Sequence, residues 1–161
     1  YKRQDASTLS PQVAAPHSPA NTRDVAEFGD VVPSIAYIGA CTGAKLEDLR
    51  AAASVLKGQR VAAGVSLMVA PASAREQAQA TQEGVMQILQ DAGATVLPNS
   101  CGACAGYGAT FPEGATVISS TARNFKGRMG PASVNVYLAS PYTVAASALR
   151  GRISDAREVL A

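Results

Sequence analysis

The stretch Ser34-Ile35-Ala36-Tyr37-Ile38-Gly39-Ala40-Cys41-Thr42-Gly43-Ala44 joins a short apolar run to a tight loop of small residues. The apolar part, Ile35 to Ile38, is typical of a short buried strand. Apolar residues then recur at helical spacing from Leu46 to Lys57. A strand, a tight loop and a helix in this order indicate a parallel α/β sheet.

The same alternation continues toward the C-terminus. Further strands are predicted over residues 61–70, 94–97, 115–119 and 134–139. Helices are predicted over residues 73–91, with a break near Gly84, and from Ser140-Pro141 to the residue before Gly151. The predicted fold class is therefore α/β, a three-layer α/β/α arrangement with a mostly parallel sheet.

Residues 1–33 differ in character from the rest of the chain. Prolines at positions 11, 16, 19 and 33 interrupt every possible helix, and no hydrophobic period survives between them. We predict an extended Pro-rich arm or linker over 1–33, either a disordered tail or a segment that lies on a larger body. One α/β domain is predicted over 34–161.

Composition excludes several classes of protein. The 161 residues include 14 Lys and Arg against 12 Asp and Glu, a formal net charge of +2. This charge is too small, and the basic residues too scattered, to indicate a nucleic-acid partner. No apolar run reaches the ~18 residues of a membrane-spanning helix. We expect a folded domain with neither partner.

Three cysteines are too few for a disulfide framework, and their odd number leaves one over. We therefore expect reduced thiols and a cytoplasmic protein. The chain begins at Tyr1 without an apolar leader, and we expect it to be an excerpt of a longer product.

Three loops are predicted to leave the carboxyl ends of strands, where parallel sheets carry their working residues. These are residues 39–45, 98–108 and 120–130. The first two hold all the cysteines, and the third holds Arg123-Asn124-Phe125-Lys126-Gly127-Arg128. Their convergence makes this edge of the sheet the candidate site.

The motif Cys101-Gly102-Ala103-Cys104 is ambiguous alone, since a redox pair, a zinc site and an iron–sulfur site all use it. The only His, His17, lies in the arm, so zinc lacks a dependable fourth ligand. With Cys41, three thiolates would suit a 4Fe–4S cluster that keeps one open iron. The alternative for Cys41 is a small buried apolar residue.

Three motifs of the chain resemble those of the aconitase superfamily. Within that superfamily they are most similar to the motifs in the large subunits of the 3-isopropylmalate dehydratase and homoaconitase group. They are Gly39-Ala40-Cys41-Thr42, Asn99 to Gly106, and Arg123 to Arg128. The likeness runs from about Pro11 to Arg157, and the order and separation of the three motifs make it specific.

The resemblance implies that Cys41, Cys101 and Cys104 ligate a 4Fe–4S cluster with one open iron site. It implies that Arg123 and Arg128 hold substrate carboxylates, a role that suits the bidentate guanidinium. The implied function is the cluster domain of a hydro-lyase that reversibly dehydrates or isomerises a di- or tricarboxylic hydroxy acid, as in amino-acid biosynthesis.

The resemblance also implies a partner. In the family the catalytic base is a serine from a swivelling domain, or from a separate small subunit, and further site residues precede this region. No catalytic residue beyond the cluster is expected in this chain, which we predict is inactive alone. The alternatives are a non-catalytic iron–sulfur or zinc-binding module and a thiol redox protein, but neither needs two arginines.

The chain departs from the family pattern at three positions. Ala40 and Gly43 stand where the first motif usually has Ser and Asn, and Ala122 stands where the third motif usually has Asn. Loss of these polar side chains would alter the hydrogen bonding around a cluster. The departures remove none of the three cysteines and neither arginine, so they bear only on the identity of the substrate.

Overall fold

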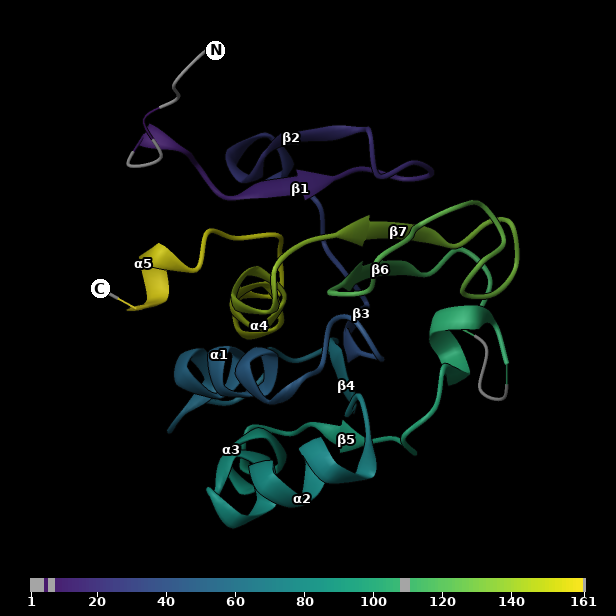
Figure 1. The fold of residues 1–161 in the computed structure, drawn as a ribbon. Coiled ribbons are helices and arrows are strands. Elements are labelled where there is room, and N and C mark those ends of the chain that lie inside the picture. Colours follow the sequence, from purple (N-terminus) through teal and green to yellow (C-terminus); the bar gives the residue numbers. More distant parts are fainter. Residues whose placement is uncertain (1–4, 6–7, 108–110, 161) are drawn as a thin grey trace.

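The structure is a computed structural model that describes residues 5, 8–107 and 111–160. Residues 1–4 and 6–7 of the predicted arm, Gly108 of the predicted 98–108 loop, and Ala161 lie outside that part. Its strands are β1 Gln12–Ala14, β2 Thr22–Asp24, β3 Ile35–Gly39, β4 Ser66–Ala70, β5 Thr95–Val96, β6 Thr116–Ser119 and β7 Asn135–Leu138. Within the described chain they form one sheet in the order β2-β1-β7-β6-β3-β4-β5 (Figure 1).

The helices confirm most of the predicted pattern. They are α1 Leu46–Leu56, α2 Ala74–Gln82, α3 Val85–Asp91, α4 Pro141–Arg150 and α5 Arg157–Leu160, with short 3-10 turns η2 Val25–Phe28 and η3 Gly102–Ala105. Gly84 breaks the 73–91 segment as predicted, because its φ of 75° is the left-handed conformation that glycine tolerates. The Ser140 hydroxyl accepts the Thr143 N–H at 3.2 Å and starts α4.

Strand residues alternate between the two faces of the sheet. Ala36 and Ile38 of β3 pack into a large core with α1, α3 and α4. Ile35 and Tyr37 point to the opposite face, into a smaller core built from the loops that follow the strands. The strand that precedes Cys41 therefore supplies side chains to both cores.

The predicted α/β class with a mostly parallel sheet is confirmed. Strands β7, β6, β3, β4 and β5 pair in parallel, and α1 to α4 lie together on one side of them (Figure 1). The other side is covered by η3 and long loops rather than by long helices. This loop layer is where the predicted site residues lie.

The described part of residues 8–33 adds two strands to the edge of the sheet. β1 pairs antiparallel with β2 and, through Ala14 and Leu138, with β7. Val13, Val25 and Phe28 are buried in the large core. The sequence predicted no strand before residue 34, because three-residue strands carry no readable period and depend on packing. The predicted division at residues 33 and 34 stays a prediction.

The predicted strand over 61–70 is shorter in the structure, where β4 begins at Ser66. Val61 and Ala62 instead donate their backbone N–H groups to carbonyls of Ala92 and Ala148, so residues 61–65 form a loop. No helix in the described residues is long and apolar enough to span a membrane.

The chain reverses its direction across the sheet between β3 and β6. From β3 it moves through β4 to β5, and it then returns to the other side of β3 to form β6 and β7. In open α/β sheets the crevice outside the carboxyl ends at such a switch point is the usual ligand site. The loop after β3 contains Cys41, and the loop after β6 leads to Arg123.

Candidate functional site

Hydrogen bonds join the loops at the carboxyl ends of β3, β4 and β5. The backbone N–H of Ala72, after β4, donates to the Ala44 carbonyl, after β3, at 2.9 Å. The Asn99 side-chain amide, after β5, donates to the Pro71 carbonyl at 3.2 Å. The loop with Cys41 and the loop with the Cys-x-x-Cys are thus both tied to the loop between them.

The loop after β6 packs against both cysteine loops. The Ser120 hydroxyl donates to the Gly43 carbonyl at 2.7 Å and accepts from the Gly39 N–H at 3.2 Å. At its far end, a Cβ placed on Gly106 would lie 2.9 Å from the carbonyl oxygen of Arg128. Glycine at 106 therefore lets the backbone after η3 approach the backbone that carries Arg128.

Arg128 and Cys104 are the two predicted site residues that the structure brings into contact. The Nη2 of Arg128 lies 3.9 Å from the sulfur of Cys104. The Nε of Arg128 is buried and has no hydrogen-bond partner in the described chain. Arg128 as a whole is half-buried, and its guanidinium keeps one donor that the described chain does not use.

Arg123 is placed differently from Arg128. It is exposed, and it makes no hydrogen bond or ion pair within residues 5, 8–107 and 111–160. Asn124 beside it is fully buried, and its amide donates to the carbonyls of Ala15 and Val136 at 2.8 and 3.1 Å. Asn124 therefore anchors residues 120–130, the arginine loop, to β7 and to the N-terminal hairpin formed by β1 and β2. Ala122, the third departure from the family pattern, is exposed.

The three cysteines are free thiols. Cys41 and Cys101 are exposed and Cys104 is buried. Across the described residues, no group of three or more His, Cys, Asp or Glu side chains is arranged to hold a metal ion. The donor chemistry nevertheless suits an iron–sulfur cluster, since thiolates are its usual ligands and all three lie on loops of one sheet edge. The half-buried Arg128 beside Cys104 also fits a negatively charged group.

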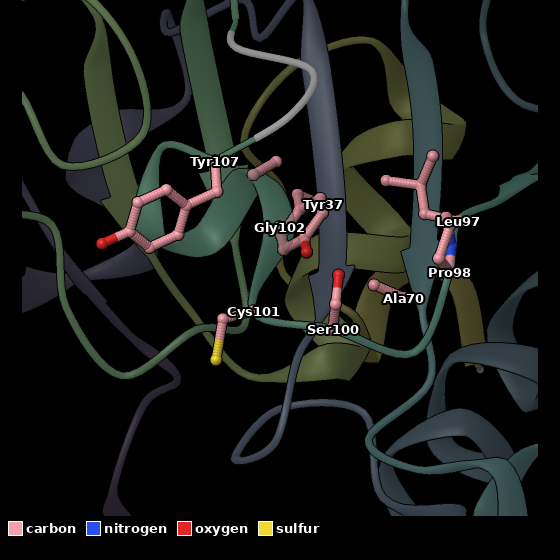
Figure 2. A pocket seen from close by; sticks show the side chains of 9 residues that line it. Tyr37, Ala70, Leu97, Pro98, Ser100, Cys101, Gly102 and Tyr107 are labelled. Carbon is pink, nitrogen blue, oxygen red and sulfur yellow. The ribbon is translucent and has the colours of Figure 1, made fainter.

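A pocket of about 370 Å³ opens beside Cys101 (Figure 2). Leu97 and Pro98 form one side of it and Tyr107 the other, and Tyr37 lies between them. Most of the lining side chains are apolar, and the hydroxyls of Tyr37 and Ser100 both point into the space between the two walls (Figure 2). The pocket thus combines apolar walls with few polar groups, which is typical of small-ligand sites.

Tyr37 and Ser120 also belong to this site, although neither residue was predicted from the sequence to do so. Tyr37 shares a core with Ala40, Ala103 and Cys104 and makes an edge-to-face contact with Phe111, with ring centroids 5.9 Å apart. Because side chains alternate between the two faces of a strand, counting back two positions from Gly39 would have indicated the face of the sheet on which Tyr37 lies. The position of Ser120 directly after a strand was the signal for its role.

Comparison with known proteins agrees with this architecture. The profile of the aconitase family (aconitate hydratase) matches residues 2–151. The 3-isopropylmalate dehydratase large subunit of Picrophilus torridus is 46% identical over 156 residues, which are 96% of this chain and 38% of that protein. The protein of the same name from Herpetosiphon aurantiacus is 44% identical over 158 residues, 97% of this chain and 37% of its own length.

Large subunit 1 of the 3-isopropylmalate dehydratase of Pyrococcus furiosus is 45% identical over 159 residues, again 97% of this chain and 38% of that protein. The chain thus spans less than two fifths of the length of these relatives. The match covers both cysteine loops and the arginine loop. This chain belongs to the aconitase family.

Proposed function

We propose that this chain is the iron–sulfur-cluster domain of a hydro-lyase that reversibly dehydrates or isomerises a small di- or tricarboxylic hydroxy acid. The supporting observation is the contact of Arg128 with Cys104 in a member of the aconitase family. A carboxylate-binding arginine beside a thiol pair suits a reaction on a hydroxy acid. A thiol redox protein could use Arg128 to stabilise a thiolate, but it would leave Cys41 and Arg123 without a role.

The proposed ligands are Cys41, Cys101 and Cys104. When bound, a 4Fe–4S cluster held by three thiolates supplies a Lewis-acidic iron with an open position for hydroxyl and carboxylate oxygens. The chain itself supplies the framework for those ligands. Ser120 holds the loop after β3, and Gly106 allows the Cys-x-x-Cys segment to pack against the arginine loop.

The proposed role of Arg123 and Arg128 is to bind and orient the carboxylates of the substrate. Arg128 is partly buried, so its unpaired Nε offers a donor that is shielded from competing water. Arg123 is exposed and reaches outward from the same loop, where it is free to meet a second carboxylate. Two guanidiniums on one loop suit a substrate with at least two carboxylates.

The proposed partner is a small subunit or swivelling domain that supplies the catalytic base. Support comes from the relatives, whose names describe a large subunit, and from their greater length. No described residue outside the two arginines is proposed to act on the substrate. The 161-residue chain alone is therefore proposed to have no turnover.

The first experiment is an iron and sulfide analysis of the chain after anaerobic purification. The proposal expects iron and inorganic sulfide, and a brown colour from thiolate-bound iron. Cys41→Ser, Cys101→Ser and Cys104→Ser should each lower the iron content, whereas Thr42→Ala, an exposed neighbour of Cys41, should not. A colourless chain with one tightly bound zinc would instead favour the non-catalytic zinc module.

The second experiment tests the arginines in the complete enzyme, with its partner present. Arg123→Lys and Arg128→Lys should raise KM and lower kcat/KM while the visible spectrum persists, because lysine offers a point charge in place of the planar fork. The control is Lys126→Gln on the same exposed loop. Unchanged kinetics in both lysine variants would remove the arginines from the substrate site.

A further inference from the structure

Tyr37 carries a buried hydroxyl with no hydrogen-bond partner. Its side chain is 0% exposed, and its oxygen meets no acceptor or donor of normal geometry in the described chain. Ser100, whose hydroxyl points into the same pocket, is not a partner (Figure 2). Because a buried hydroxyl without a partner is destabilising, this group calls for an explanation.

The strand directs this hydroxyl toward the cysteine loops. Tyr37 lies on the face of β3 that carries the loop layer, and its ring lies over the backbone of Gly39. A Cβ on Gly39 would lie 2.6 to 2.8 Å from the Cε1, Cζ and hydroxyl oxygen of Tyr37. Glycine at 39 thus leaves the space in which the ring leans toward the carboxyl end of the strand.

The hydroxyl lies close to the Cys-x-x-Cys. Tyr37 packs with Ala103 and Cys104 in one core and lines the same pocket as Cys101. Burial first, and then the electrostatic effect of the nearby Cys104 and Cys101, raises the pKa of Tyr37 from 10.0 to about 12. The backbone N–H of Cys104 acts on this pKa in the opposite direction and lowers it. The hydroxyl keeps its proton at neutral pH.

We propose that Tyr37 is a positioning residue of the cluster site, whose hydroxyl donates a hydrogen bond to sulfur at the Cys101–Cys104 side of a bound cluster. This inference rests on the proposed function and adds a residue to it. A donor beside cluster sulfur offsets the extra negative charge of the reduced state. Tyr37 therefore raises the reduction potential and slows oxidative loss of the cluster.

The test compares Tyr37→Phe with the unaltered chain, both reconstituted anaerobically with iron and sulfide. Phenylalanine keeps the ring and its contact with Phe111, so circular dichroism should be unchanged. The control is Tyr107→Phe, which removes a hydroxyl from a 72% exposed residue at the rim of the same pocket. The readouts are the midpoint potential, from a titration followed by electron paramagnetic resonance, and the rate of colour loss in air.

The expected result is a more negative midpoint potential and faster loss of colour in Tyr37→Phe, with Tyr107→Phe unchanged. Equal potentials and equal rates in Tyr37→Phe and the unaltered chain overturn this inference and leave the proposed function standing. An unaltered chain that binds no iron and sulfide overturns the proposed function, and the inference with it. An equal shift in both variants also overturns the inference, because a general effect of the pocket then explains it.

Discussion

Ser120, the residue directly after β6, donates its hydroxyl to the carbonyl oxygen of Gly43, in the loop after β3, over 2.7 Å. The same hydroxyl accepts the backbone N–H of Gly39 at 3.2 Å. One side chain thereby joins the carboxyl ends of the two strands at the switch point of the sheet. The loop between the two glycines carries Cys41.

Ser120→Ala should destabilise the fold, because it leaves the Gly39 N–H and the Gly43 carbonyl without their partner. The expected loss is about 1–3 kcal/mol of the free energy of unfolding, measured by urea denaturation. Ser133→Ala is the matched control, since its exposed hydroxyl accepts only from the Gly114 N–H. Equal losses in both variants would contradict a special role for Ser120.

Gly43→Ala should also be destabilising, by about 1–3 kcal/mol, because the added methyl has no space. A Cβ at Gly43 would lie 2.1 Å from the carbonyl oxygen of Ser120, and backbone cannot yield as a side chain does. Gly29→Ala is the control, since Gly29 has a φ of −58° and its Cβ would meet only one atom, at 3.8 Å. A thermal shift assay compares the two, and a Gly43→Ala chain as stable as Gly29→Ala would refute the close contact.

The same contact gives a physical reason for one departure from the family pattern. In this structure an asparagine at position 43 would collide with the backbone of Ser120 even more than alanine does. The close approach that allows the Ser120 hydroxyl to bond the Gly43 carbonyl therefore requires glycine at position 43. Alanine at 40 is 3% exposed and packs into the core near Cys104, so a polar side chain there would need a buried partner.

Asn124→Ala should loosen the arginine loop. The Asn124 amide bonds two carbonyls, one in the N-terminal hairpin and one in β7, and both would lose a donor. We expect a loss of about 1–3 kcal/mol and faster amide hydrogen exchange in residues 120–130. Asn135→Ala is the control, because that side chain makes no hydrogen bond to the described chain. Unchanged exchange in the loop would show that Asn124 does not anchor it.

Stability below neutral pH should depend on Glu83, which pairs with Arg50 between α1 and α2. Hydrogen bonding to Arg50 lowers the pKa of Glu83 below its ordinary value of 4.5. The pair therefore adds stability at and above that value, and this contribution is lost as pH falls through the lowered pKa. The Glu83→Gln chain should show a shallower fall in melting temperature over that range.

Glu113→Gln, an exposed change elsewhere on the surface, should keep the slope of the unaltered chain. High salt should reduce the difference for Glu83→Gln, because exposed ion pairs are screened. A pH profile of Glu83→Gln that overlays that of the unaltered chain would exclude the linkage.

Much of the fold was predictable because local signals are strong where glycine, proline and apolar periods act together. Ser140 and Pro141 start α4, and Gly84 separates α2 from α3, as the sequence predicted. The hairpin of β1 and β2 was not predictable, since its stability comes from Val13 and from pairing with β7 rather than from local propensity. The ligand roles of the cysteines and the roles of the arginines stay predictions.

Family membership and the succession of strands and helices follow from residues that act within a few positions of one another, such as caps, glycines and the cysteine motif. The contacts of Ser120 with Gly43, of Arg128 with Cys104 and of Asn124 with Ala15 join residues 24 to 109 positions apart. No periodic pattern in the sequence predicts such pairs, because they form only when the order of the strands in the sheet brings the loops together. The placement of the buried Tyr37 hydroxyl beside the cysteines is likewise a product of packing.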